Sequence, residues 1–207
     1  MRSSQLENIV ASLPVHLLLI ATIVVVSLIG MSSESVKRAL ILNPYRVRHD
    51  GHIHRLLTAG WLHGDFAHLA FNMITLYFFA NDVLRILGPV RFLALYLSAV
   101  VMGYVPSTLR YMHKKQYSSL GASGAVAAVL FSAILLVPKL KLYLMFLPIP
   151  VPGIVFGIAY LAYSAWLSRS ASDGVNHDAH FFGAVYGAMF TFAFEPARVE
   201  RTIKSFF

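Results

Sequence analysis

The sequence predicts an all-α polytopic membrane protein with six membrane-spanning helices, and three observations support this fold class. Hydrophobic residues make up 57% of the 207 residues and charged residues only 13%, which is too apolar for a soluble domain of this size. Apolar segments long enough to cross a bilayer recur along the chain. Polar loops that contain proline or glycine separate these segments. We expect one membrane domain over residues 1–207, with helices at about 13–30, 65–80, 90–105, 123–137, 152–167 and 180–194.

The first helix and the loop after it have distinct signatures. The apolar run over 13–30 is longer than the core of a signal peptide, and Arg2 is the only basic residue before it. We therefore expect this run to be retained as a membrane helix. The long first loop, 31–62, is polar and basic, and we expect it to lie on the membrane surface. Asp65 then stands where a helix N-cap is expected, and the second helix follows it.

Prolines mark the ends of the later helices. Pro106 closes the third apolar run, and the fourth run ends before Pro138. Three prolines alternate with other residues from 148 to 152, and such a pattern cannot continue a helix, so we expect the fifth helix to begin near Pro152. The sixth run ends at Glu195, which Pro196 follows.

Charge and cysteine content exclude several classes of function. The formal net charge is +8, but the basic residues are scattered between apolar runs, which favours contact with anionic membrane lipids and not with nucleic acid. The chain has no cysteine, which excludes disulfides, thiolate chemistry and cysteine-ligated metals. Lysine and arginine are divided almost equally between alternate loops, so they do not predict the membrane orientation.

A short glycine-flanked serine motif is the first feature that points to chemistry. Gly121, Ser123 and Gly124 lie where a polar loop turns into the fourth apolar run. Glycines permit a tight turn, and the first turn of a helix offers free N–H groups and the positive end of its dipole. A hydroxyl at such a place is a candidate nucleophile beside an anion-stabilising site, although small residues before a membrane helix are also typical of close helix packing.

Two other helices supply polar partners at membrane depth, where polar groups are costly. His68 and Asn72 are four residues apart and share one face of the second helix. His180 shares a face of the sixth helix with Gly183 and Gly187, which permit close approach of another helix. The pattern predicts that His180 is the base for Ser123 in a Ser–His dyad, with no carboxylate needed.

Oxyanion stabilisation is the expected role of the second-helix pair. Negative charge that develops on a carbonyl oxygen needs hydrogen-bond donors in a low-dielectric pocket. We expect these donors to be the backbone N–H of Ser123, the Asn72 amide and His68. Each polar residue also has a purely structural interpretation, as interhelical glue or as a satisfied buried histidine.

These motifs together resemble the rhomboid family of intramembrane serine proteases. The resemblance is carried by Gly121-Ala122-Ser123-Gly124, by His68 and Asn72, and by Ala179-His180 with Gly183 and Gly187, in the family's order. It implies a six-helix rhomboid-like bundle in which Ser123 attacks the scissile carbonyl, His180 acts as base and then acid, and His68 and Asn72 stabilise the oxyanion. It also implies transmembrane protein substrates, no cofactor and no metal. The compact form and the lack of targeting extensions predict a bacterial plasma membrane, with an organelle as the alternative.

Three departures from the family pattern stand out. The first loop has His54 before Arg55 where the family usually has tryptophan before arginine. Ala127 replaces an aromatic residue that often packs on the base. A further histidine and an aspartate, residues 177 and 178, immediately precede the base helix. We expect the position of His180 to depend on another aromatic residue; the candidates are Phe181, Phe182 and Tyr186.

Other classes of function fit the sequence less well. A catalytically inactive rhomboid-like protein that binds membrane segments is the main alternative. A metalloprotease would use four histidines, His63, His68, His177 and His180, but the chain lacks a His-Glu-x-x-His motif. A transporter would show inverted repeats, and none is visible. The serine elbow of soluble hydrolases is excluded because alanine occupies position 125.

Overall fold

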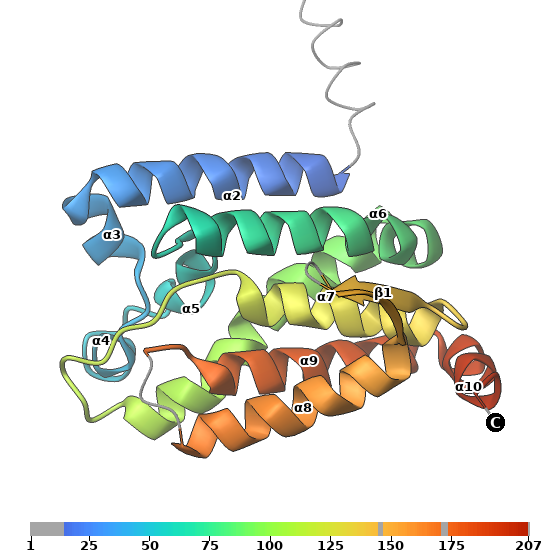
Figure 1. Cartoon of the computed structure of the whole chain (residues 1–207). Helices are drawn as coiled ribbons and strands as arrows, with labels where there is room; N and C mark the ends of the chain where they lie inside the picture. Colours follow the sequence, from blue (N-terminus) through green and yellow to red (C-terminus); the bar gives the residue numbers. More distant parts are fainter. Residues whose placement is uncertain (1–14, 145–146, 171–173, 207) are drawn as a thin grey trace, which may run out of the picture.

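Helix α7 (Ser123–Leu136) runs through the middle of a helical bundle, between α6 and α9 (Figure 1). The computed structural model describes residues 15–144, 147–170 and 174–206. Within α7, every residue except Ser123 and Leu135 is buried. A helix that is apolar on all sides is stable only when neighbours surround it. The proposed nucleophile therefore begins the innermost helix of the fold.

The other elements follow one another along the chain as helices and one small hairpin. They are α2 (Val15–Ser32), α3 (Glu34–Leu40), α4 (Pro44–His49), α5 (Arg55–Thr58), η1 (Ala59–Trp61), α6 (Phe66–Tyr111), α7, β1 (Lys141–Leu144), β2 (Leu147–Pro152), α8 (Gly153–Ser170), α9 (His177–Phe194) and α10 (Pro196–Lys204). The fold is thus an all-α membrane bundle, as the sequence predicts.

Helix α6 combines the second and third expected membrane helices. Gly88 interrupts it with φ 77° and ψ 167°, and Pro89 follows. Only glycine adopts such a left-handed conformation without strain. The expected turn before Pro89 is therefore helical up to the kink, and the second half continues past Pro106 to Tyr111. A proline inside a membrane helix is tolerated when its neighbours satisfy the freed backbone groups.

The remaining helix boundaries differ from the predicted ones by a few residues. The prediction of 13–30 for the first helix becomes Val15–Ser32, with residues 13 and 14 outside the described part of the chain. Helix α9 begins at His177, three residues earlier than predicted, because the Asn176 side chain caps it. Capping residues extend a helix beyond its apolar stretch.

The first loop is ordered by short helices and by one buried cation. Asn43 caps α4, and the buried Arg55 guanidinium donates hydrogen bonds to the carbonyls of Arg38 at 2.8 Å and Ile41 at 2.7 Å. Leu42 pairs with Ser119 in an antiparallel bridge. This bridge ties the first loop to the segment that leads into α7.

Strands β1 and β2 form a hairpin that the sequence did not predict. Strand β1 pairs antiparallel with β2, with Leu142 opposite Val151. Prolines at alternate positions of β2 exclude a helix but are compatible with an edge strand. The hairpin lies at the end of the bundle beside the start of α8 (Figure 1).

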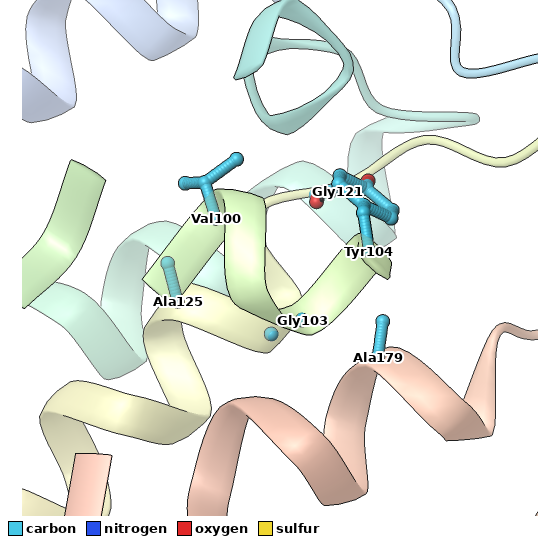
Figure 2. Close-up of a pocket in the computed structure, with 7 residues that line it drawn as sticks. Val100, Gly103, Tyr104, Gly121, Ala125 and Ala179 are labelled. Carbon is cyan, nitrogen blue, oxygen red and sulfur yellow. Dashed lines mark hydrogen bonds between the residues drawn. The ribbon is translucent and has the colours of Figure 1, made fainter. Parts of the chain in front are cut away.

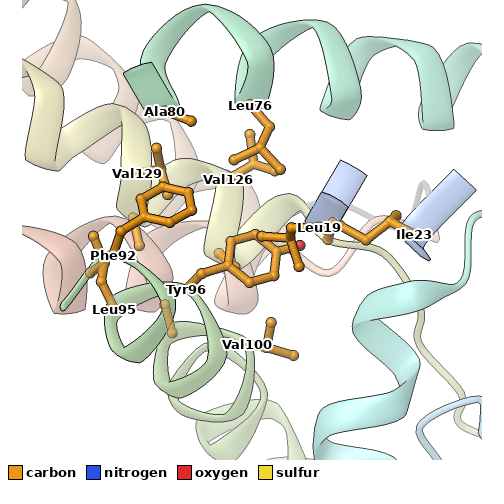
Figure 3. Packing of buried hydrophobic residues seen from close by; sticks show 14 of the residues in the cluster. Leu19, Ile23, Leu76, Ala80, Phe92, Leu95, Tyr96, Val100, Val126 and Val129 are labelled. Carbon is orange, nitrogen blue, oxygen red and sulfur yellow. The ribbon is translucent and has the colours of Figure 1, made fainter. Parts of the chain in front are cut away.

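Figure 3 shows the part of the apolar core in which side chains of α2, α6 and α7 pack together. Leu76 on the first half of α6 and Phe92 on the second half are both fully buried, as is Ile23 on α2. They pack in one cluster with Val129 of α7. Two described helices, α2 and α6, have the length and hydropathy to cross a membrane, and α7 is a shorter apolar helix.

Candidate active site

The segment before α7 is held from several sides, and this fixes the start of the helix. Gly121 has φ 124°, a conformation that favours glycine. Its N–H donates to the carbonyl of Ala59 at 3.0 Å, and its own carbonyl accepts from the Tyr104 hydroxyl at 2.8 Å. Ser123 is the first residue of α7 and is half-buried. Its hydroxyl therefore stands on a rigid turn at the positive end of a buried helix.

His63 supports the same turn and links it to α2. Its Nε2 accepts the Ala122 N–H at 3.4 Å, and its Nδ1 lies 2.8 Å from the Ser27 hydroxyl. Ser27 donates to the Trp61 carbonyl at 2.8 Å, so Nδ1 of the histidine is the donor toward Ser27. This pattern requires a neutral ring.

The environment of His63 favours that neutral form. Burial, together with nearby His68, lowers the pKa of His63 to about 4, against a smaller opposite effect of Asp65. The ring is only 3% exposed. His63 is therefore a buried residue that contacts the segment leading to Ser123.

The pair on α6 lies beside the same turn. A Cβ atom placed on Gly121 would lie 2.8 Å from Cε1 and 3.1 Å from Nε2 of His68, and 3.8 Å from Oγ of Ser123. The His68 ring and the Ser123 hydroxyl thus face the same glycine. Asn72 is buried, and its amide donates to the His68 carbonyl at 2.9 Å. An amide nitrogen has two N–H groups, and this bond uses one of them.

Helices α7 and α9 cross at glycines. A Cβ atom on Gly183 would lie 2.1 Å from the carbonyl oxygen of Gly124, and one on Gly124 would lie 2.9 Å from the carbonyl oxygen of Ala179. One turn further, a Cβ atom on Gly187 would lie 2.3 Å from the carbonyl oxygen of Ala128. The two backbones are in direct contact, which only glycine permits.

The two proposed catalytic residues are direct sequence neighbours of residues at this crossing. Ser123 precedes Gly124, and His180 follows Ala179. Figure 2 shows Ala179 of α9 facing the second half of α6 and the beginning of α7. A small pocket lies between these three helices, and it is lined by Val100, Gly103, Tyr104, Gly121, Gly124, Ala125 and Ala179.

One ring contact of His180 is with another histidine, and the three aromatic candidates make contacts of their own. The ring of His177 lies edge-on to that of His180, with centroids 5.7 Å apart. The ring centroids of Phe181 and Phe182 are 5.2 Å apart. The Tyr186 hydroxyl donates a hydrogen bond of 2.9 Å to the Ser98 hydroxyl. Support of His180 by one of the three aromatic candidates stays a prediction.

The aspartate near the base is engaged elsewhere. Asp178 forms an ion pair with Arg110 at 3.0 Å and accepts a hydrogen bond from Ser168. It thus joins α9 to the ends of α6 and α8. Asp178 thus has a cation and a hydroxyl as partners, and the Ser–His dyad stays a prediction.

Asn176 is a polar residue of the site that the sequence analysis missed. Its Oδ1 accepts the Ala179 N–H at 3.0 Å, and its Nδ2 donates to the hydroxyls of Ser107 at 3.0 Å and Ser119 at 3.1 Å. An asparagine directly before a helix is a recognised N-cap signal. The predicted helix start at residue 180 concealed that signal.

The histidines of the metalloprotease alternative occur as two pairs. His63 and His68 have ring centroids 4.9 Å apart, and His177 lies beside His180. Within residues 15–144, 147–170 and 174–206, no group of three or more histidine, aspartate or glutamate side chains has the arrangement of a metal site.

Comparisons with known proteins point to one family. A family model described as "Rhomboid domain" matches residues 50–196. RHOMBOID-like protein 12, mitochondrial, of Arabidopsis thaliana is 32% identical over 154 residues, which cover 67% of this chain and 46% of that protein. Presenilin-associated rhomboid-like protein, mitochondrial, of Mus musculus is 32% identical over 142 residues, which cover 64% of this chain and 36% of that protein.

A yeast relative shows the same pattern. Rhomboid protein 1, mitochondrial, of Saccharomyces cerevisiae is 30% identical over 142 residues, 65% of this chain and 40% of that protein. The chain thus spans less than half the length of these relatives. All three are named as mitochondrial proteins, and this contradicts the prediction of a bacterial plasma membrane. A single domain over residues 1–207 stays a prediction.

Proposed function

Because this chain belongs to the rhomboid family, we propose that it is an intramembrane serine protease that hydrolyses peptide bonds of transmembrane proteins. The family includes both proteases and inactive members, so the proposal rests on the site. One observation carries it: the first turn of α7, with Ser123, meets α9 at Ala179 and Gly183, on either side of His180. This contact supports a dyad whose nucleophile comes from α7 and whose base comes from α9.

The proposed reaction follows the usual course of serine acyl transfer. His180 accepts the hydroxyl proton of Ser123 as Oγ attacks the scissile carbonyl, and a tetrahedral oxyanion forms. His180 then donates that proton to the leaving amine, and the peptide bond breaks to give an acyl-enzyme. Water then attacks the ester, again with His180 as base, and a second tetrahedral intermediate forms. When this intermediate breaks down, it releases the new carboxyl group and restores the Ser123 hydroxyl.

The groups around Gly121 are suited to hold the oxyanion. His68 faces Gly121 beside the Ser123 hydroxyl, and Asn72 lies one turn further along the same helix. Backbone N–H groups in the first turn of α7 have no partner within the helix. Donors that are fixed before the reaction stabilise developing charge without having to reorganise.

The substrate class and location follow from the family and from the relatives. A bundle with apolar outer faces admits a substrate that is itself in the membrane, so we propose transmembrane proteins as substrates and membrane lipids as the surroundings. The names of the relatives favour a mitochondrial membrane. No cofactor enters the proposed reaction.

The decisive experiment is cleavage of a single-span model substrate by the full chain in lipid vesicles. We expect cleavage by the wild type, and no cleavage by Ser123→Ala or His180→Ala. A fluorophosphonate probe should label the wild type and fail to label Ser123→Ala, which gives a second measurement independent of substrate choice. Activity retained in either variant would exclude the dyad. If the wild type neither cleaves nor is labelled, while it still binds the substrate segment, the inactive membrane-binding alternative is correct.

A further inference from the structure

We propose that Asn176 is a positioning residue that couples the helix of the base to the loop of the nucleophile. This inference rests on the proposed function and adds a residue to it. Asn176 lies four residues before His180. It is not one of the proposed catalytic or oxyanion-stabilising residues. Its amide contacts three separate elements, namely α9, α6 and the segment before α7.

The amide has its full donor capacity in use. Oδ1 caps α9 by accepting the Ala179 N–H, and Nδ2 donates to Ser107 and Ser119. Since the cap requires an acceptor, the orientation of the amide is determined by its partners. A single side chain therefore holds the first turn of α9 against two hydroxyls from other parts of the fold.

Both hydroxyls are connected to the turn at Gly121, which precedes Ser123. Ser119 exchanges two backbone hydrogen bonds with Leu42, each 3.0 Å, and lies two residues before Gly121. Ser107 donates to the carbonyl of Tyr104 at 3.1 Å, and the Tyr104 hydroxyl donates to the Gly121 carbonyl at 2.8 Å. The amide thus reaches Gly121 by two routes, one along the loop and one through α6.

The consequence is a constraint on the distance between base and nucleophile. Glycines at the α7–α9 crossing allow the helices to touch, but they have no side chains that would lock the two helices in register. The Asn176 amide supplies that lock at the end of α9 that carries His180. A displacement of about 1 Å between reacting groups costs roughly 100-fold in rate.

Two kinds of variant separate this role from simple helix capping. Asn176→Ser keeps a good capping oxygen but removes both N–H donors. Ser107→Ala with Ser119→Ala removes the acceptors and leaves the cap intact. Asn43→Ser is a matched control, because Asn43 also caps a helix, α4, and its amide donates to the Lys115 carbonyl at 3.0 Å.

We expect Asn176→Ser and the double serine variant each to lower kcat by at least about tenfold, with KM unchanged. The rate of fluorophosphonate labelling at Ser123 should fall in parallel. The triple variant should be no slower than Asn176→Ser, because all three changes break one connection. Asn43→Ser should keep the wild-type kcat.

Three outcomes would overturn the inference. In the first, Asn176→Ser lowers thermal stability but leaves kcat and labelling at wild-type values, which would make Asn176 a cap only. In the second, the losses of Asn176→Ser and the double serine variant multiply in the triple variant, which would show that the contacts act separately. In the third, the wild type neither cleaves nor is labelled, and the proposed function then fails together with this inference. If Asn176→Ser does not fold, the double serine variant alone decides.

Discussion

At the scale of single residues, His63 shows how a neutral ring supports the turn before Ser123. Nε2 accepts the N–H of Ala122, and Nδ1 donates to Ser27 on α2. A protonated ring has no acceptor, so the Ala122 N–H would lose its partner. The neutral state of this ring is thus part of the structure.

The stability of the protein should therefore decrease in mild acid through His63. Its pKa is about 4 in the folded chain against 6.5 when unfolded, so the unfolded chain takes up the proton first as the pH falls below 6.5. The contribution is complete above pH 6.5 and is lost toward pH 4, a change of up to about 3 kcal/mol. The unfolding midpoint of the wild type and of His63→Gln should be measured from pH 4 to 8. Identical pH dependence in both proteins would contradict this role.

Asn72 should affect the rate of the proposed reaction and have little effect on folding. Loss of an oxyanion donor typically slows an enzyme by about 100-fold or more, so Asn72→Ala should retain a slow, measurable cleavage. Thr75→Val is the control, because Thr75 on the same helix makes an equivalent bond to the carbonyl four residues earlier, at 2.8 Å. An Asn72→Ala rate equal to that of Thr75→Val would remove Asn72 from the site.

At the scale of elements, the contact of α7 with α9 determines where the proposed site lies. In a membrane the lipid is as apolar as the helices, so association depends on close packing and on polar contacts. Gly183 and Gly187 bring the two backbones together. Ser132 and Thr191 add a hydrogen bond of 2.7 Å between the same helices.

Even the smallest side chain at Gly187 should separate these helices. The added Cβ atom of Gly187→Ala would lie 2.3 Å from a backbone oxygen, and overpacking of this kind costs about 1–3 kcal/mol. Gly157→Ala on α8 is the matched control, since its nearest neighbour would be 3.5 Å away, an ordinary contact. We expect a lower unfolding midpoint and lower activity for Gly187→Ala alone. Equal midpoints for the two variants would show that the crossing is not close-packed.

At the scale of the whole molecule, the two ends of the bundle have different roles. The proposed site lies at the end where α6 finishes and where α7 and α9 begin, together with the ordered first loop (Figure 1). The β-hairpin and α10 lie at the opposite end. If α7 crosses the membrane, these two ends must face opposite compartments.

Single cysteines should report this topology, because the chain has none of its own. Lys114→Cys and Lys139→Cys, both at exposed positions on either side of α7, should react with a membrane-impermeant maleimide from opposite sides of sealed vesicles. Arg48→Cys should label from the same side as Lys114→Cys, since the Lys115 ammonium lies 5.3 Å from the ring of Tyr45 on α4. Labelling of positions 114 and 139 from one side would contradict a membrane-spanning α7.

The fold class and the identities of the proposed site residues could be predicted from the sequence because they depend on local chemistry. Apolar length and helical spacing indicated the bundle, and the spacing of Gly183 and Gly187 indicated one helix face. The roles of Ser123, His180, His68 and Asn72 stay predictions until the variants are measured. The helical continuation through Pro106 and the hairpin could not be read in the same way, since neighbouring elements decide both.

By itself, then, the sequence determined an all-α membrane bundle and a family, because composition and motif spacing act along the chain. Only the tertiary structure decided which side chains meet across it. His63 is buried because α2 and the turn before Ser123 enclose it. Asn176 forms hydrogen bonds with Ser107 and Ser119, which lie 69 and 57 positions away along the sequence. Such contacts depend on how helices pack, and no local pattern in the chain encodes a distance between separate helices.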